Sequence, residues 1–290
     1  MFKIGEKVHH RTRPDVGVGK LVALLDNGSC TVDFPTCRFT GIPLHVIGTV
    51  EQIEIERREA EARLKKQQAE IRKRVRLDRE QAQQDEKRRE HEIVQQQILA
   101  AFAKYDVRVF WHMTHKKNVS NILKHGILNH HGSRKFIDID ISNPDIQKRR
   151  EKKDPIYGHK IHDYSSLYIN PINPMFYVLS DEKPDLCLIE VMTSVLAEHK
   201  FLFSDGNAAA RNTLFYNSLD DINLLPWNII KAFSRCDDFD AKRKRCAEVL
   251  IYPKIPPRFI ANIYCFSGST LDYLRDCGRN VSFFSSKLVF

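Results

Sequence analysis

The sequence predicts an α+β fold in three parts: a small β-barrel over residues 1–50, a long charged helix over residues 51–104, and a larger mixed domain over residues 105–290. Three observations predict this division. Short apolar runs separated by turn residues fill the first part, and the second part contains neither Gly nor Pro. The third part mixes strand-like and helix-like runs and holds most of the aromatic residues, so the largest core is expected there.

The first part reads as short apolar strands separated by turns. The dipeptide Asn27-Gly28 joins two alternating runs, VGVGKLVALL and GSCTVDF, and is typical of a tight hairpin. The spacing of the turn signals divides this part into about five short strands, which favours a small bent barrel. The run IGEKVHH followed by Gly17-Val18-Gly19 resembles the SH3/Tudor-like modules of bacterial transcription and helicase factors. That resemblance implies a barrel that binds a protein or nucleic-acid partner.

The second part is dominated by Glu, Arg, Lys, Gln and Ala, which are good helix formers. Opposite charges lie four residues apart, as in Glu59 with Arg63 and Glu61 with Lys65, and such pairs support an exposed helix. The apolar positions keep no steady heptad, so the pattern favours a solvated, semi-rigid helix over a long coiled coil. Dimerisation through part of the helix stays open as an alternative.

The composition leaves several function classes open. The 42% of hydrophobic residues can supply a core, and the net charge of +9 suits either a protein that binds polyanions or plain solubility. The seven cysteines include no C-x-x-C pair, which argues against a zinc knuckle and is typical of buried thiols in a reducing cytosol. The sequence has no signal-peptide pattern after Met1 and no apolar run of about 18 residues, so we expect a cytoplasmic bacterial protein without a membrane span.

The third part opens with a histidine-rich stretch, VFWHMTHKKNVSNILKHGIL, at residues 109–128. Its alternation of apolar and polar residues predicts a strand that runs to about Thr114. A helix is then expected, with Asn118 or Ser120 as its N-cap and its end at Gly126.

The histidines of this stretch allow three interpretations. His112 and Thr114 share one strand face, whereas His115 lies near the turn and would point away from His112. No metal-binding motif completes a ligand set, so we expect no metal. A packed core histidine and a nucleotide pocket both remain, because an imidazole and a hydroxyl at a strand end can bind a ribose and an amide.

Five blocks in the third part occur in the order found in one enzyme family. They are WHMTHKKNVSNILKHGI, DIQKRREKK, HDYSSLYINPINPMFY, FSDGNAAA and RKRCAEVLIY. The set is similar to DarT, the DNA ADP-ribosyltransferase toxin family. Two features depart from the family pattern: Ser204 stands where a Thr is expected, and Leu167-Tyr168-Ile169 replaces a fuller aromatic run. The predicted barrel and long helix lie outside the resemblance.

The resemblance implies an ADP-ribosyltransferase-type mixed fold that uses NAD⁺ as co-substrate and no metal. The reaction breaks the nicotinamide–ribose bond through an oxocarbenium-like transition state, which a carboxylate beside the ribose can stabilise. Glu248, directly before the strand-like run VLIY, is expected to supply that carboxylate; the alternative is a solvated glutamate at a strand edge. Arg150, favoured over Arg149 by its spacing, is expected to hold the pyrophosphate. The family also gives this arginine a part in deprotonating the acceptor base, although its pKa above about 12 makes it a poor base.

The resemblance implies further contacts with NAD⁺. The expected residues are His112 and Thr114 at the nicotinamide and its ribose, Asn121 as support from the helix, and Tyr168, Met175 and Tyr177 as walls of the pocket. Met175 would suit an ordinary core equally well.

Acceptor recognition is expected in residues 207–247, which precede the strand of Glu248. Chemistry on a base requires an unstacked base, so single-stranded nucleic acid is the expected substrate. The candidates for binding it are Asn207, Arg211, Trp227, Arg235, Lys242, Arg243, Lys244 and Arg245, together with Lys148 and Arg149 on the basic helix. The run KRKR at residues 242–245 is, by itself, equally typical of a solvated helix end.

These residues together predict an NAD⁺-dependent transferase that modifies a base in single-stranded DNA, as a bacterial toxin or phage-defence effector. The family implies a macrodomain protein that removes ADP-ribose as the antitoxin. Two alternatives stay open: the same transfer onto RNA, and a catalytically silent adaptor that binds nucleic acid. The sequence does not select the base, its sequence context, the partner of the barrel or the oligomeric state.

Overall fold

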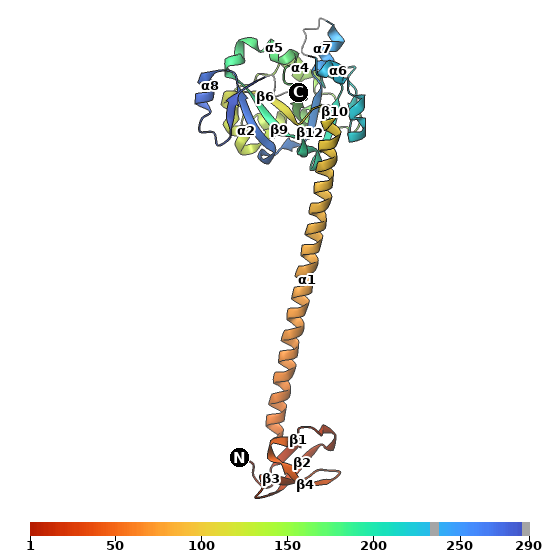
Figure 1. Cartoon of the computed structure of the whole chain (residues 1–290), viewed down its shortest axis with the longest axis vertical. Helices are drawn as coiled ribbons and strands as arrows, with labels where there is room; N and C mark the ends of the chain where they lie inside the picture. Colours follow the sequence, from red (N-terminus) through yellow and green to blue (C-terminus); the bar gives the residue numbers. More distant parts are fainter. Residues whose placement is uncertain (233–237, 286–290) are drawn as a thin grey trace. The chain divides into compact units, whose positions relative to one another are not determined.

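The computed structural model describes residues 1–232 and 238–285, and it divides into two compact units, Met1–Glu86 and Lys87–Phe290 (Figure 1). One helix, α1 (Val50–Ala103), crosses the boundary between the units. Within the described residues, no helix combines the length and the apolar character that a membrane span requires.

The first unit holds a five-stranded antiparallel sheet with the strand order β4-β3-β2-β1-β5. Its elements are β1 (Lys7–His10), η1 (Pro14–Val16), β2 (Val18–Leu24), β3 (Ser29–Asp33), β4 (Arg38–Pro43), η2 (Leu44–Val46) and β5 (Ile47–Thr49). The predicted hairpin at Asn27-Gly28 joins β2 to β3. Gly19 lies against the small core, where a Cβ would come within 2.5 Å of Val32 Cγ1.

The predicted closed β-barrel is wrong, because this sheet is open, and the resemblance to SH3/Tudor-like modules is not confirmed. Strands β4 and β5 form its two edges, and no ladder joins them in the described part of the chain. Closing a barrel requires the edge strands to tilt and pair along their length. β5 has three residues, pairs with β1 and continues directly into α1, so it offers little backbone for a second ladder.

α1 has 54 residues, and most of its length is exposed. Ion pairs at i and i+4, such as Arg57 with Glu61 and Arg76 with Glu80, lie along its surface. Only Ile98 and Phe102 are buried among its described residues. The last turns of α1 therefore belong to the core of the second unit. The sequence-based division had instead placed them in the linker that ends at residue 104.

The second unit is built on an eight-stranded mixed sheet with the order β11-β10-β12-β8-β6-β9-β14-β15. Among its described strands, only the β14–β15 pair is parallel. Its strands are β6 (Val109–His115), β8 (Ser165–Tyr168), β9 (Leu186–Met192), β10 (Lys200–Ser204), β11 (Phe215–Tyr216), β12 (Glu248–Tyr252), β14 (Ile260–Cys265) and β15 (Val281–Phe283). A separate pair is formed by β7 (Ile127–Leu128) and β13 (Lys254–Ile255). The predicted mixed fold of this part is confirmed.

Short helices connect these strands (Figure 1). The α-helices are α2 (Val119–His125), α3 (His130–Ser133), α4 (Pro144–Arg149), α5 (Pro174–Val178), α6 (Trp227–Ile230), α7 (Phe239–Arg245) and α8 (Gly268–Tyr273). The 3₁₀ helices are η3 (Lys116–Asn118), η4 (Ile161–Asp163), η5 (Ser180–Asp185), η6 (Thr193–Ala197), η7 (Leu219–Leu224) and η8 (Pro257–Phe259).

The predicted strand and helix of the histidine-rich stretch are β6 and α2. Asn118 occupies the N-cap position of α2, and Gly126 ends the helix with a φ of +87°. A Cβ at Gly126 would lie 2.1 Å from the carbonyl oxygen of Ile255, so a side chain has no room there. The central strands pack against the end of α1: the ring of Phe102 lies edge-on to Phe110 and Phe203, with centroids 5.2 and 5.8 Å away.

Candidate active site

A cavity of about 360 Å³ opens beside the central strands of the second unit. Its volume is in the range of small-molecule sites. Six of the eight residues predicted to bind NAD⁺ or catalyse transfer line this cavity: His112, Thr114, Arg150, Tyr168, Met175 and Glu248. The other two, Asn121 and Tyr177, do not. Strands β6, β8 and β12 are adjacent in the sheet, so they bring these distant blocks of the sequence to one wall.

Arg150 and Glu248 form an ion pair in this cavity. Nη2 of Arg150 lies 2.9 Å from Oε2 of Glu248, and Nη1 lies 3.3 Å from Oε1. The Arg150 side chain is 11% exposed and that of Glu248 is 3% exposed, and Arg150 also donates to Oγ of Ser166. Burial lowers the pKa of Arg150, but the charge and hydrogen bonds of Glu248 outweigh burial and raise the pKa above its ordinary value. Arg150 is thus a permanent cation, suited to binding an anion and unsuited to accepting a proton.

Glu248 is fixed by its surroundings. It is the first residue of β12, and Oε1 accepts a hydrogen bond from the backbone N–H of Ala208 at 2.8 Å. Its own backbone N–H donates to Oγ of Ser204 at 3.0 Å, and that hydroxyl donates to the carbonyl of Gly206 at 2.7 Å. Ser204 therefore keeps the hydroxyl of the Thr that the family pattern predicts at this position. The alternative of a solvated strand-edge glutamate is excluded by this burial.

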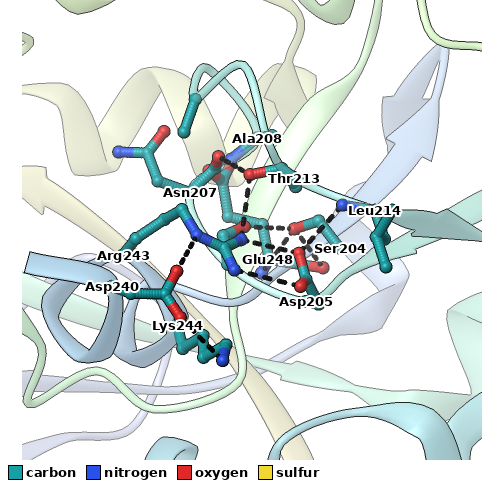
Figure 2. A network of polar contacts seen from close by, with 12 residues as sticks. Ser204, Asp205, Asn207, Ala208, Thr213, Leu214, Asp240, Arg243, Lys244 and Glu248 are labelled. Atoms are coloured by element: carbon teal, nitrogen blue, oxygen red, sulfur yellow. Dashed lines mark hydrogen bonds and ion pairs between the residues drawn. The ribbon is translucent and has the colours of Figure 1, made fainter.

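The loop that wraps Glu248 is held by a buried arginine (Figure 2). Nη1 and Nη2 of Arg243 lie 2.7 and 3.1 Å from the two carboxylate oxygens of Asp205, and Nε lies 2.8 Å from Asp240. Nη1 also donates to Oγ1 of Thr213 at 3.2 Å. Gly206 lies so close that a Cβ there would come within 2.8 Å of the Arg243 carbonyl oxygen. Arg243, predicted to bind nucleic acid, instead holds this loop in place.

His112 is half-buried in the cavity wall, and its surroundings favour the neutral imidazole. Burial lowers its pKa to about 4, although a hydrogen bond with the backbone of Ser166 acts in the opposite direction. Nδ1 lies 3.3 Å from the carbonyl oxygen of Ser166, which can only accept, so Nδ1 carries the proton. The other ring nitrogen, Nε2, is then left as an acceptor for a ligand donor such as a carboxamide N–H.

Asn118, and not the predicted Asn121, lines the main cavity from the start of α2. Nδ2 of Asn118 donates to Oγ1 of Thr114 at 3.1 Å and to the carbonyl of Ile139 at 2.7 Å, while Oδ1 accepts from the N–H groups of residues 138 and 139. Asn121 donates to the carbonyl of Phe136 at 2.7 Å and lines a smaller adjoining cavity. The two asparagines lie one helical turn apart, so both hold the segment that follows α3.

Of the two tyrosines predicted as walls of the pocket, Tyr168 lines the cavity and Tyr177 does not. Tyr168 lines the cavity opposite Glu248 in the β8–β12 ladder, and burial raises the pKa of its hydroxyl. Tyr177 is 54% exposed on α5 and is not among the residues that line the cavity. Residues that the sequence reasoning missed complete the wall: Asn118, His130, Gln147, His162 and Ser166.

Three of the predicted nucleic-acid contacts are buried and serve the fold. Trp227 is 9% exposed, stacks on Tyr105 with 4.0 Å between ring centroids, and donates from Nε1 to the carbonyl of Ile222 at 2.7 Å. Arg245 is 4% exposed and donates to the carbonyl of Ile172. Together with Arg243, these side chains are turned into the protein and cannot meet a DNA strand.

The remaining predicted contacts stay accessible. Asn207 lines a third cavity, next to the first, together with Arg150 and Glu248. The exposed basic side chains are Arg211, Lys242, Lys148 and Arg149, and the half-buried Lys244 pairs with Asp240 at 2.7 Å. Arg235 lies outside the described residues.

Comparison with known proteins identifies relatives of this unit. A family model described as ssDNA thymidine ADP-ribosyltransferase, DarT, matches residues 111–286, which is more than half of the chain. The chain is 28% identical over 171 residues to a DNA ADP-ribosyl transferase of Thermus sp. (strain 2.9), covering 54% of this chain and 80% of that protein. It is 31% identical over 163 residues to a fusion of a DNA ADP-ribosyl transferase and a DNA ADP-ribosyl glycohydrolase from Thermosipho africanus, covering 54% of this chain and 42% of the fusion.

Solved structures of the Thermus sp. 2.9 protein share the fold. Its complex with ADP-ribosylated ssDNA superposes with a TM-score of 0.58 at 22% identity, over 64% of this chain and 97% of that one. Its complex with NAD⁺ superposes with a TM-score of 0.55 at 22% identity, over 62% and 96% of the two chains. The short connections and the mixed sheet of the second unit are therefore those of this transferase fold.

Proposed function

Since the chain belongs to the DarT family of ssDNA thymidine ADP-ribosyltransferases, we propose that it transfers ADP-ribose from NAD⁺ to a base in single-stranded DNA. The family description names thymidine, and thymidine is the acceptor that we propose. The observation that carries the proposal is the buried ion pair of Arg150 and Glu248 in a cavity of suitable size. A binding module without catalysis has no need to bury these two charges side by side.

Glu248 is proposed to stabilise the ribose in the transition state. As the C1′–nicotinamide bond breaks, positive charge grows on the sugar, and a carboxylate held by Ala208 and Arg150 is already oriented toward it. The acceptor base gives up a proton and forms the new bond to C1′, while nicotinamide leaves as a neutral molecule. The backbone and side-chain donors on Glu248 keep the carboxylate fixed, so little reorganisation accompanies the reaction.

Arg150 is proposed to bind the pyrophosphate of NAD⁺ while it remains paired with Glu248. A guanidinium has five N–H donors in a planar fork, so one edge can hold a carboxylate and another an anion. His112 offers Nε2 to the nicotinamide amide, and Thr114 and Asn118 line the same wall. Tyr168 and Met175 are proposed as the apolar contacts of the nicotinamide ring.

The acceptor strand is proposed to approach the loop of residues 205–214. This loop carries Asn207 beside the cavity and Arg211 on the surface. Exposed lysine and arginine side chains on α4 add positive charge for the phosphates, which position a strand without reading its sequence. Arg243 acts only indirectly here, because it holds the loop through Asp205.

Mass spectrometry of oligonucleotides tests the proposal. Single-stranded DNA and RNA of matched sequence, with and without thymidine or uridine, are incubated with the protein and NAD⁺. We expect an ADP-ribose adduct on the thymidine-containing DNA, and its loss in Glu248→Gln. An adduct on RNA alone would favour the RNA alternative, whereas NAD⁺ consumption without an adduct would indicate a hydrolase. A folded protein that neither consumes NAD⁺ nor modifies an oligonucleotide would support the silent adaptor.

A cellular role as a toxin or phage-defence effector follows from the same proposal. The Thermosipho relative carries, by its name, a transferase and a glycohydrolase in one chain. We propose that a macrodomain-type glycohydrolase, encoded separately or fused, reverses the modification made by this chain in the bacterial cytoplasm. The docking role expected of the N-terminal module stays a prediction.

A further inference from the structure

Three side chains with metal-binding atoms meet beside the cavity, and we propose that they form a site for a divalent transition-metal ion. His131 lies on α3, Glu151 follows α4, and His162 lies on η4. Their ligand atoms all lie within 4.8 Å of one another. Two imidazoles and one carboxylate are a ligand set that zinc takes in proteins, with water completing the coordination.

His162 has the surroundings of a metal-binding histidine. Its ring is 4% exposed and stacks on His130, with 4.1 Å between the ring centroids. Nε2 lies 2.9 Å from Oε1 of Gln147, an arrangement in which the Nε2–H can donate to an amide oxygen. A partner of this kind fixes the ring and leaves the other nitrogen as the ligand.

That other nitrogen faces a carboxylate. Nδ1 of His162 lies 2.9 Å from Oε1 of Glu151. When Nε2 carries the proton for Gln147, both Nδ1 and Oε1 are acceptors, and two acceptors at this distance need a cation to hold them together. A proton can serve, and a metal ion can displace it, because metal binding releases protons from its ligands. His131 supplies the third ligand from the neighbouring helix.

Lys160 is the built-in competitor of such an ion. Its Nζ lies 2.7 Å from the second carboxylate oxygen of Glu151. This ion pair is half exposed, so it contributes little stability and can be given up. Removal of the Lys160 charge should therefore strengthen metal binding. Metal binding by histidines that do not involve Glu151 would not depend on Lys160 in this way.

The position of the site gives the ion a structural role. Glu151 directly follows Arg150, and His162 and His130 both line the cavity. An ion held by His131, Glu151 and His162 would tie the segment after α4 to α3, next to the arginine of the proposed reaction. The ligand set contains no thiolate, so borderline ions such as Zn²⁺, Ni²⁺ and Co²⁺ are the expected class.

Calorimetric titration of the full chain with Zn²⁺ and Ni²⁺ tests the site without NAD⁺ or DNA, so its outcome is independent of the proposed function. We expect one saturable equivalent, with affinity at least about tenfold weaker in His131→Ala and in Glu151→Gln. His131 and Glu151 are exposed, so these variants should fold. His125→Ala, which removes a histidine that stacks on Phe136, is the matched control and should bind as the parent does.

Two further readouts complete the test. Lys160→Met should lower the Kd, and the absorption spectrum of the Co²⁺ form should lack the thiolate charge-transfer band that binding at cysteines would give. Absence of saturable binding would overturn the proposal. So would binding that is unchanged in both His131→Ala and Glu151→Gln, because the ion would then be held elsewhere.

Discussion

Replacement of Arg243 by Ala should destabilise the second unit. The side chain is 5% exposed, and its two Nη atoms hold the Asp205 carboxylate at 2.7 and 3.1 Å. Without the guanidinium, Asp205 stays buried and keeps the N–H of Leu214 as a partner at 2.9 Å. Breaking a buried ion pair from one side typically destabilises a protein by about 3–5 kcal/mol. Asp205 keeps one hydrogen bond, and Asp240 is half exposed and can be solvated. We therefore expect the free energy of unfolding to fall by about 3 kcal/mol, near the lower limit of that range.

Urea unfolding followed by tryptophan fluorescence measures this change. The chain has two tryptophans, Trp111 and Trp227, and both are buried in the second unit, so the signal reports on that unit. Lys242→Ala is the matched control, since Lys242 belongs to the same basic run and is exposed. A surface change of this kind should alter the free energy of unfolding by less than about 0.5 kcal/mol.

A double-mutant cycle with Asp205→Ala isolates the pair. If the two side chains stabilise the loop together, the double variant should be less destabilised than the sum of the two single variants. One result would refute the reasoning: an Arg243→Ala variant with the same free energy of unfolding as the parent protein but weaker binding of single-stranded DNA in fluorescence anisotropy. That result would restore the sequence-based prediction that Arg243 contacts nucleic acid.

Three other outcomes are expected. Ser204→Ala should lower stability by about 1–3 kcal/mol in the same urea titration, because the Glu248 N–H loses its partner, whereas Ser204→Thr should retain both stability and transferase activity. A fragment of residues 87–290 should fold, whereas a fragment of residues 101–290 lacks Ile98 and its core contacts and should be less stable. In the full chain, Ile98→Ala should lower the free energy of unfolding by about 2–5 kcal/mol. The pKa of His112 is lowered from 6.5 to about 4 in the folded state, so the unfolded state binds a proton more readily. The free energy of unfolding should therefore be highest above pH 6.5 and should fall by about 3 kcal/mol as the pH falls toward 4, at about 1.4 kcal/mol per pKa unit. His112→Gln should flatten that part of the stability profile, and an unchanged profile would contradict a neutral imidazole at this position.

The wall of the cavity was predictable from sequence because two independent signals converge on it. Strand alternation placed His112 and Thr114 on one face, and the order of the family blocks pointed to Arg150 and Glu248. The family relationship inferred from those blocks is confirmed over residues 111–286. Asn121 was expected to support the cofactor from the helix, whereas the structure places Asn118 in the wall of the main cavity and Asn121 in the wall of the adjoining one. The two residues lie about one turn apart, so only the fold shows which one reaches the main cavity.

The errors have a common physical origin. A basic run is normally solvated, and the sequence gives no sign that Arg243 and Arg245 turn inward; acidic and carbonyl partners distant in sequence, such as Asp205 and Ile172, make that burial possible. Trp227 was likewise predicted to bind nucleic acid, although it stacks on Tyr105, which follows the end of α1. Tertiary partners decide these cases, and local sequence does not contain them.

The end of α1 bears on how such a protein can evolve. The family match begins at residue 111, yet the interior of the second unit already includes Phe102, whose ring packs on Phe110 and Phe203. The family match and the folded unit therefore begin at different residues. An N-terminal extension whose last helical turn packs into this core cannot be replaced by an arbitrary domain. Every replacement must also supply a helix end whose side chains pack in the positions of Ile98 and Phe102.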